Sequence, residues 1–196
     1  MIRKAAWSDL DAVERLYNEL HDAKEAGLIP VIWRRGVYPS RNTAASALER
    51  DDLFVLETDG RIVGSGIINQ IQNDFYNSAP WMYDVPDDQV CVLHTLGISP
   101  SEFGKGYARA FLDFYEAYAL AHGCTELRID TNVRNEVARG MYRRRGYKEV
   151  GTVPTMFNGI PGVDLILLEK HLEPKQDLYP EQKQLPEKTR INNADT

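Results

Sequence analysis

The sequence predicts a mixed α/β domain of the α+β type, in which a central sheet of about seven strands is flanked by about four helices. The segment 52–69 contains two apolar, β-branched runs joined by Asp59-Gly60, which is typical of an antiparallel hairpin with a tight turn. The segment 90–99 is almost continuously apolar and stops at Pro100, as a buried central strand does. The strand-like and helix-like segments follow an order that is not a simple repeat of parallel strand–helix units.

The other elements follow from local patterns. Apolar side chains recur with helical spacing after Ser8 and Asp9, either of which can cap the long first helix. Asn135 is the expected N-cap of the last helix. The segments 28–43 and 70–88 lack periodicity and are expected to be loops, and a loop as long as the second is often functional. In order, we expect a strand at 1–5, helices at 7–27 and 44–51, the hairpin at 52–69, a strand at 90–99, a helix at 108–119, a strand at 125–131, a helix at 135–145, and strands at 146–153 and 162–172.

Composition limits the classes to which the protein can belong. Its 196 residues suffice for one sizeable core, so we expect a single domain over 1–172, followed by a polar, flexible tail over 173–196. The net charge of −6 disfavours a nucleic-acid-binding protein. No signal peptide is recognisable and no apolar run reaches membrane-spanning length. We therefore expect a cytoplasmic protein without nucleic-acid or membrane partners.

The two cysteines do not indicate a disulfide or a metal site. Cys91 and Cys124 have neither the number of a disulfide framework nor the spacing of metal ligands. We expect both to be reduced thiols in the core, and we expect no bound metal.

A glycine-rich turn separates the strand at 90–99 from the next helix. Gly104 and Gly106 bracket Lys105. Such a turn often binds phosphate, because the first amides of a helix lack intrahelical partners and glycine has no Cβ to hold a diphosphate away. The pattern is not a nucleoside-triphosphate loop, because Gly106 follows the lysine, and not a dinucleotide fingerprint, because Arg109 replaces the third glycine. A tight turn without a ligand is the alternative.

The residues around this turn form an ordered set of motifs. They are Leu96 and Ile98 on the strand before Pro100, Gly104, Gly106 and Ala108 in the loop, Asn135, Ala138 and Tyr142 in an N-x-x-A-x-x-x-Y run, and Arg145-Gly146-Tyr147. With these motifs the segment 90–151 resembles the GNAT superfamily of N-acetyltransferases. The resemblance implies the GNAT acyl-CoA N-acyltransferase fold and acetyl-CoA as co-substrate. It also implies a homodimer as one option, with the final strands as a common contact.

The resemblance implies where the co-substrate binds. The strands 90–99 and 125–131 are expected to splay, and the pantetheine arm is expected to pair with their backbone like an added strand. Phe103 stands where the family usually has Arg or Gln, and Lys105 and Arg109 are candidates to replace that charge. The expected cofactor-binding residues are Leu96, Ile98, Phe103, Gly104, Lys105, Gly106, Tyr107, Ala108, Arg109, Asn135 and Tyr142.

Acetyl transfer to an amine needs a base for the amine, donors for the oxyanion and a proton for the thiolate. The resemblance implies the Leu96 amide as oxyanion donor, with Gly97 easing close approach or forming a simple bulge, and Tyr142 as the acid. Strand alternation predicts that His94 shares a face with Leu96, and the arylalkylamine branch of the family has a histidine at this offset. We therefore expect His94 to be the base, directly or through a water. The alternative for His94 is a core histidine that bonds the backbone, and the alternative for Tyr142 is an aromatic side chain that packs on the core.

The two long loops are expected to form the acceptor wall. They combine aromatic side chains with carboxylates, which suits a cationic amine. A small-molecule amine is the expected acceptor, a peptide amine is an alternative, and simple packing of the loops is the other reading. The expected substrate-binding residues are Trp33, Tyr38, Trp81 and Tyr83.

Three functions stay open from the sequence. The first is an acetyl-CoA-dependent N-acetyltransferase that acts by direct attack in a ternary complex, since neither cysteine has an activating neighbour. The second is a non-catalytic acyl-CoA-binding sensor or structural module, and the third is an enzyme that uses a longer acyl group. His94 and Tyr142 favour the first over the second, because a binding module needs neither.

Overall fold

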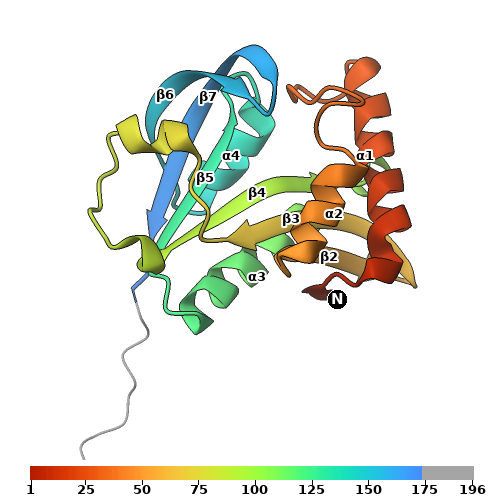
Figure 1. Cartoon of the computed structure of the whole chain (residues 1–196), viewed down its shortest axis with the longest axis horizontal. Helices are drawn as coiled ribbons and strands as arrows, with labels where there is room; N and C mark the ends of the chain where they lie inside the picture. Colours follow the sequence, from red (N-terminus) through yellow and green to blue (C-terminus); the bar gives the residue numbers. More distant parts are fainter. Residues whose placement is uncertain (174–196) are drawn as a thin grey trace, which may run out of the picture.

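A seven-stranded mixed sheet runs through residues 1–173, the part of the chain that this computed structural model describes (Figure 1). The strand order is β1-β2-β3-β4-β5-β7-β6, and every neighbouring pair is antiparallel except β4 and β5. The expected tail over 173–196 lies outside the described residues except for Glu173. The strands are β1 (Ile2–Lys4), β2 (Leu53–Thr58), β3 (Arg61–Asn69), β4 (Val90–Ile98), β5 (Glu126–Asn132), β6 (Lys148–Phe157) and β7 (Ile160–His171), and the helices are α1 (Leu10–Glu25), α2 (Arg41–Glu49), α3 (Tyr107–Ala121) and α4 (Glu136–Arg144).

The helices cover both faces of the sheet, because alternate residues of the same strand pack on different helices. In β2, Leu53 and Val55 belong to the cluster with α1 and α2, whereas Phe54 and Leu56 belong to the cluster with α3 and α4. Figure 1 shows α1 and α2 together over the β2–β4 half of the sheet. None of the described helices is long and apolar enough to cross a membrane.

The predicted fold class and the predicted order of elements are confirmed. Asp59 and Gly60 form the expected tight turn, with φ angles of 49° and 71°. The helix expected at 44–51 begins earlier, at Arg41, because Ser40 precedes it as N-cap and its amide donates to Thr43 Oγ1 at 3.0 Å. Asp9, one of the two predicted capping residues, is the N-cap of α1, but its carboxylate accepts from the Ala6 amide and from Arg3 and makes no capping bond to the helix.

Strands β4 and β5 splay apart, as expected. Their pairing ends at Leu93 and Ile129, although β4 continues to Ile98 and β5 to Asn132. Beyond this point β4 pairs only with β3, and β5 pairs only with β7, among the described strands. The sheet therefore opens along its middle where the sequence places Leu96.

A bulge in β4 lies at the opening. Ser65 of β3 stands opposite Gly97 and Ile67 stands opposite His94, so one extra residue is present on β4 between these pairs. Thr95 lies in the bulge with a φ of 53°, which is unusual for a β-branched residue. Because the bulge interrupts the period of two, the alternation that was expected to place His94 and Leu96 on one face does not hold here.

The segment 70–88 packs against the β5–β7 half of the sheet, where it appears in yellow in Figure 1. It contains two short 3₁₀ helices, Asp74–Ser78 and Asp87–Gln89. Tyr76 in the first is buried against Val90, Val92 and Leu167. The loop is therefore fastened to the sheet at its middle.

Candidate acyl-transfer site

The loop after β4 exposes main-chain amides at the start of α3. Gly104 and Gly106 have φ angles of 80° and 85°, which glycine adopts without strain. Residues 103–106 are exposed, and no described atom would lie within 4 Å of a Cβ added to either glycine. No described side chain caps α3, so its first amides stay available. The loop presents donors and the positive end of a helix dipole, which suits a diphosphate.

The cationic side chains at this loop are not all available. Lys105 Nζ donates to Glu102 Oε2 at 2.8 Å, and Arg61 also pairs with Glu102, at 3.3 Å. Arg109 is exposed on the first turn of α3, and Phe103 is 49% exposed. Of the two cations expected to replace the charge missing at Phe103, Lys105 is therefore already engaged.

A cavity of about 90 Å³ occupies the opening between β4 and β5. The Tyr142 side chain is 5% exposed there, and burial raises the pKa of its phenol above the ordinary value. The start of α4 is capped as expected, since Asn135 Oδ1 accepts a bond of 3.2 Å from the Ala138 amide. The predicted residues that line this splay cavity are Leu96, Asn135, Tyr142, Trp33 and Tyr38.

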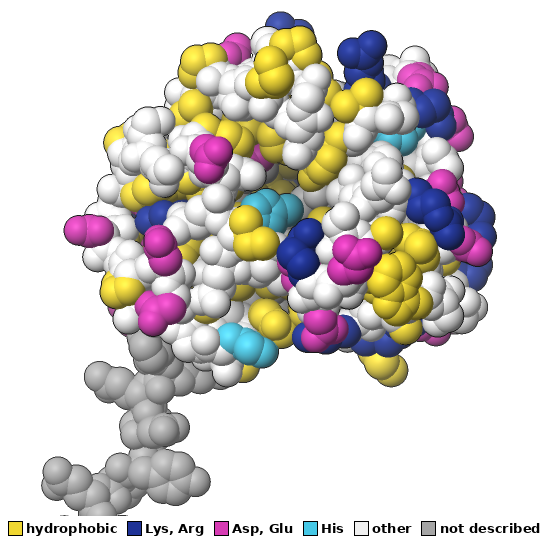
Figure 2. All heavy atoms as spheres, viewed as in Figure 1, with side chains coloured by type: hydrophobic (Ala, Val, Ile, Leu, Met, Phe, Trp, Pro, Cys, Tyr) yellow, Lys and Arg dark blue, Asp and Glu magenta, His cyan; other side chains and the backbone are white. Residues whose placement is uncertain are grey.

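A larger cavity of about 630 Å³ lies on the α2 side of the same opening. In Figure 2 this face is hollowed near its centre, with hydrophobic side chains around the hollow and a histidine at its edge. His94 and Tyr38 are the predicted residues that line it, together with hydroxyl and amide side chains from α2 and the loops. The two cavities share Tyr38, Leu93, Thr95, Asp130 and Phe157.

His94 belongs to a hydrogen-bond network that fixes its tautomer. Asn69 Nδ2 donates to Asp52, so Asn69 Oδ1 is the atom that faces His94 Nε2 at 3.1 Å, and the Ile71 carbonyl is also 3.1 Å from Nε2. Both partners accept, so the proton lies on Nε2 and the lone pair on Nδ1. Burial lowers the pKa of His94 to about 4, because the surrounding atoms shield the ring although part of it borders the cavity.

Comparison with known proteins identifies this arrangement. The model of the acetyltransferase (GNAT) family matches residues 13–147, which is more than half of the chain. The chain belongs to the acetyltransferase (GNAT) family. It is an acetyltransferase of that family, as the sequence motifs implied.

Solved structures share the fold of this acetyltransferase. A GNAT-family acetyltransferase from Streptococcus agalactiae has a TM-score of 0.72 at 21% identity, over 88% of this chain and 95% of that one. A putative acetyltransferase from Staphylococcus aureus has a TM-score of 0.65 at 24% identity, over 88% and 99%. The yncA protein from Salmonella typhimurium, a putative acetyltransferase solved with its cofactor acetyl-CoA, has a TM-score of 0.63 at 18% identity, over 88% and 94%.

Two of the predicted acceptor residues lie away from both cavities of the acetyltransferase. Trp81 stacks over Arg128, with 4.2 Å from the guanidinium carbon to the ring centre, and its Nε1 donates to the Tyr76 carbonyl. Tyr83 stacks on His171 with ring centres 4.7 Å apart. The structure thus gives both rings packing partners in the 70–88 loop, in line with the alternative reading of simple loop packing.

The structure also gives the packing contacts of other residues that the sequence analysis named, and it confirms both cysteines as buried free thiols. The Ile98 side chain packs over Gly64, since a Cβ added at Gly64 would lie 2.7 Å from Ile98 Cδ1. Ile98 is not among the residues that line the two cavities. Gly97 makes room for Leu20 of α1, since a Cβ there would lie 2.6 Å from it. Cys91 and Cys124 are buried and unpaired by a disulfide, and burial raises the pKa of each thiol, which disfavours nucleophilic thiolates.

Asp130 is the residue of the site that the sequence analysis missed. It follows the buried Ile129 near the end of β5 and lines both cavities. Its Oδ2 accepts from the Tyr76 hydroxyl at 2.8 Å and from Asn73 Nδ2 at 3.3 Å. The available signal for Asp130 was a polar residue on the strand that was expected to part from β4. Its hydrogen-bond partners, however, come from a loop more than fifty residues earlier.

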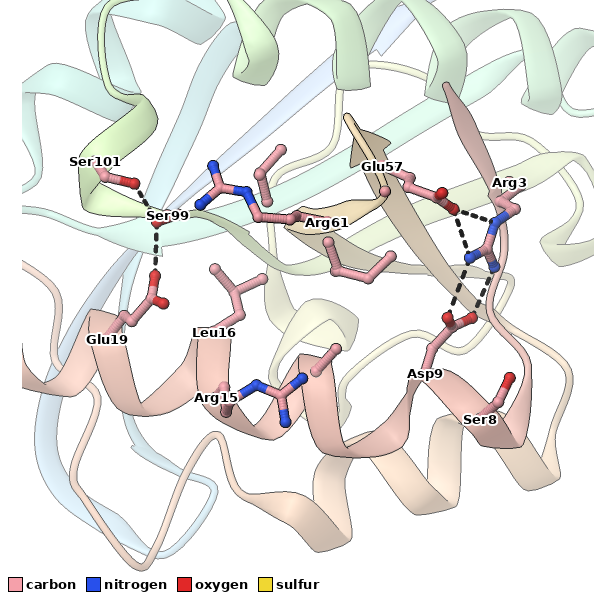
Figure 3. A pocket seen from close by; sticks show the side chains of 14 residues that line it. Arg3, Ser8, Asp9, Arg15, Leu16, Glu19, Glu57, Arg61, Ser99 and Ser101 are labelled. Atoms are coloured by element: carbon pink, nitrogen blue, oxygen red, sulfur yellow. Dashed lines mark hydrogen bonds and ion pairs between the residues drawn. The ribbon is translucent and has the colours of Figure 1, made fainter.

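A third cavity, of about 420 Å³, lies between α1 and the ends of β3 and β4 (Figure 3). It shares no lining residue with the other two. Arg3 joins Asp9 and Glu57, and Ser99 joins Glu19, while Arg15 and Arg61 stand on opposite walls (Figure 3). Because arginines and carboxylates are balanced there, this cavity has no single charge to select an anion or a cation.

Proposed function

We propose that this acetyltransferase moves the acetyl group of acetyl-CoA to a primary amine by direct attack in a ternary complex. The observation that carries the proposal is the junction of the two cavities at the opening of the sheet. The splay cavity suits the thioester end of acetyl-CoA. The larger cavity of about 630 Å³ suits the amine and is named the acceptor cavity. Because both are lined by Thr95 and Asp130, the amine and the thioester carbonyl can meet without an acyl-enzyme.

The residues around the junction have complementary roles in the proposal. The amides around Gly104 and Gly106 hold the diphosphate. Leu96 lies in the bulge, beyond the last pair with β5, and its amide donates to the oxyanion. Tyr142 lines the splay cavity and protonates the departing thiolate, and its raised pKa keeps the phenol protonated until that step.

The proton of the acceptor has two candidate destinations in the acceptor cavity. His94, proposed from the sequence, has its lone pair on Nδ1 and acts directly or through a water. Asp130, found in the structure, has a free carboxylate oxygen, as described below. Both side chains line the acceptor cavity.

A thiol-release assay tests the proposal. Acetyl-CoA is incubated with the enzyme and with alkylamines, arylalkylamines, polyamines, amino acids and a short peptide, and free CoA is measured. We expect release with at least one small amine and slower release with the peptide. Tight acetyl-CoA binding without release for any amine would favour the non-catalytic sensor, and faster release from a longer acyl-CoA would favour the third function of the sequence analysis.

A further inference from the structure

Asp130 lines both cavities at their junction, and its two carboxylate oxygens differ in their partners. Tyr76 and Asn73 both donate to Oδ2, at 2.8 and 3.3 Å. Within residues 1–173, Oδ1 receives no hydrogen bond. One oxygen is therefore fastened to the 70–88 loop, and the other is available to a ligand.

Asp130 has no cationic partner in the part of the chain that the structure describes. No Lys, Arg or His among those residues forms an ion pair with it, and its two donors are neutral. Among residues 1–173, the guanidinium that lines the acceptor cavity belongs to Arg50, which donates from Nε to Asp52 at 2.8 Å. An ionised Asp130 thus gives the cavity a negative charge without a counter-ion, and a half-buried charge of this kind is stabilised when a cation pairs with it.

We propose that Asp130 binds the acceptor as an ammonium ion through Oδ1 and accepts the first proton that the nitrogen loses. The inference rests on the proposed function and extends it in two ways. It names the acceptor class, an amine that is cationic in water and has no acidic group beside the nitrogen. It also makes Tyr76 a positioning residue, because the Tyr76 bond holds Oδ2 and leaves Oδ1 as the oxygen without a partner among the described residues.

The proton balance is complete with the groups present. Asp130 takes one proton from R–NH₃⁺, and the lone pair released forms the N–C bond with the thioester carbonyl. The tetrahedral intermediate collapses with cleavage of the C–S bond, and the thiolate takes the proton of Tyr142. The nitrogen then loses its second proton to the Tyr142 phenolate, and Asp130 releases the first to solvent. The products are the amide, CoA thiol and one proton.

The ionisation of Asp130 agrees with this role. Burial raises the pKa of Asp130 to about 6, and the bonds from Tyr76 and Asn73 keep it from rising further. The other titratable groups that face it are Tyr38, Tyr142 and His94, all of them neutral at neutral pH. Asp130 is therefore mostly ionised at pH 7 and close to the range in which a base works best, whereas His94 is a weaker base.

The first measurement is the pH dependence of kcat/KM with the fastest alkylamine of the screen. We expect an acid limb with an apparent pKa of about 6. Asp130→Asn should lower kcat/KM by about 10²–10⁴-fold and leave the Kd of acetyl-CoA unchanged, because the amide keeps the shape but takes no proton. Asp59→Asn makes the same chemical change at an exposed turn and should leave both quantities unchanged.

The second measurement separates a charge effect from a structural one. A fluorinated analogue of the same alkylamine is largely uncharged at neutral pH, because fluorine withdraws electrons from the nitrogen. Asp130→Asn should slow its acetylation much less than that of the parent amine. Tyr76→Phe should move the acid limb to higher pH, because the lost bond had favoured the ionised carboxylate. Tyr147→Phe is its control, since that buried hydroxyl has no partner among the described residues.

The outcomes are distinguishable. Equal losses for both amines in Asp130→Asn, or an acid limb near pH 4 in the wild type, would overturn the inference and leave the proposed function intact. A wild type that releases no CoA with any amine would overturn both. If Asp130→Asn does not fold, the pH profiles of the wild type and of Tyr76→Phe still test the role of Asp130. An acid limb with the same apparent pKa in both proteins would contradict that role.

Discussion

The glycine loop offers a matched test of the diphosphate site. Gly106 and Gly123 flank α3, both have positive φ angles, 85° and 78°, and a Cβ added at either position would meet no described atom within 4 Å. Replacement of either by Ala imposes the same left-handed strain, about 1–2 kcal/mol. For a chain of this length, that corresponds to a fall in Tm of about 2–8 °C. Stability alone therefore does not separate the two variants.

Acetyl-CoA binding should separate them. The Cβ of Gly106→Ala points into open space beside the exposed amides of α3, where we place the diphosphate. Loss of one or two charge-assisted hydrogen bonds, at about 1.5–3 kcal/mol each, weakens binding by about 1.5–6 kcal/mol. This is a rise in Kd of about 10- to 10⁴-fold.

Titration calorimetry with acetyl-CoA and thermal unfolding of both variants give the two quantities. We expect similar Tm values, a wild-type Kd for Gly123→Ala and the large rise in Kd for Gly106→Ala. Equal Kd values for the two variants would refute the assignment of the loop as the diphosphate site, because the same backbone strain would then have no consequence at the ligand.

Three further predictions concern the chemistry and the acceptor wall. Tyr142→Phe should lower kcat by about 100-fold with little change in acetyl-CoA affinity, and an unchanged kcat would exclude it as the acid. His94→Gln should lower kcat/KM but keep the acid limb near pH 6, and loss of that limb in a pH profile would make His94 the base in place of Asp130. Tyr38→Phe removes the hydroxyl that bonds Thr95 at the bulge and should lower kcat/KM by about 2- to 10-fold. Tyr83→Phe is the control, because that ring lines neither cavity, and it should leave the steady-state kinetics unchanged.

The parts of the site that the sequence predicted depend on local backbone chemistry. The glycine loop, the Asn135 cap and the position of Tyr142 on α4 follow from residues within one or two turns of each other. The expected splay of β4 and β5 is also present, since their pairing stops at Leu93. The first three features are set by nearby residues, which a single sequence displays directly, whereas the splay involves strands far apart in the chain and was implied by the resemblance to the family.

A simple bulge at Gly97 was one of two expected readings, but the position of the bulge at Thr95 was not predictable in this way. A β-branched residue rarely takes a positive φ, and nothing in the sequence marks position 95 as an exception. The bulge depends on partners far along the chain, because Tyr38 bonds the Thr95 hydroxyl and β3 sets the register on either side. A shift of one residue in that register changes which side chains face each cavity, so His94 and Leu96 line different cavities.

The aromatic residues of the 70–88 loop show the same limit. Their composition suited an acceptor wall, but Trp81 and Tyr83 stack on Arg128 and His171, which lie on strands formed much later in the chain. The wall of the acceptor cavity instead includes Phe157, from the end of β6, and hydroxyl and amide groups of α2. Periodicity and composition do not show which of two aromatic loops will find a packing partner.

The face of β5 that the 70–88 loop covers explains why the half-buried Asp130 differs from the buried Glu126. Glu126, Arg128 and Asp130 alternate along the strand and so point to the same face. Glu126 has His171 as a partner at 3.1 Å, and Arg128 is bonded by the loop through Gln72 and the Tyr83 carbonyl. The ionisable groups at the closed end of the strand thus lie close to opposite charges of the protein itself, since Arg128 interacts with both Glu169 and Glu126.

Asp130, at the open end, is matched within the described residues only by the neutral donors of Tyr76 and Asn73. The same loop therefore has two electrostatic effects. It adds neutral hydrogen-bond partners to a cluster of opposite charges where β4 and β5 are still paired, and it leaves one carboxylate without a counter-ion among the described residues where they part. A charge left unpaired at the point where both cavities meet costs stability in the free enzyme, and that cost is recovered when a cation from outside the chain binds there. This is the physical reason to seek the acceptor among amines that arrive as ammonium ions.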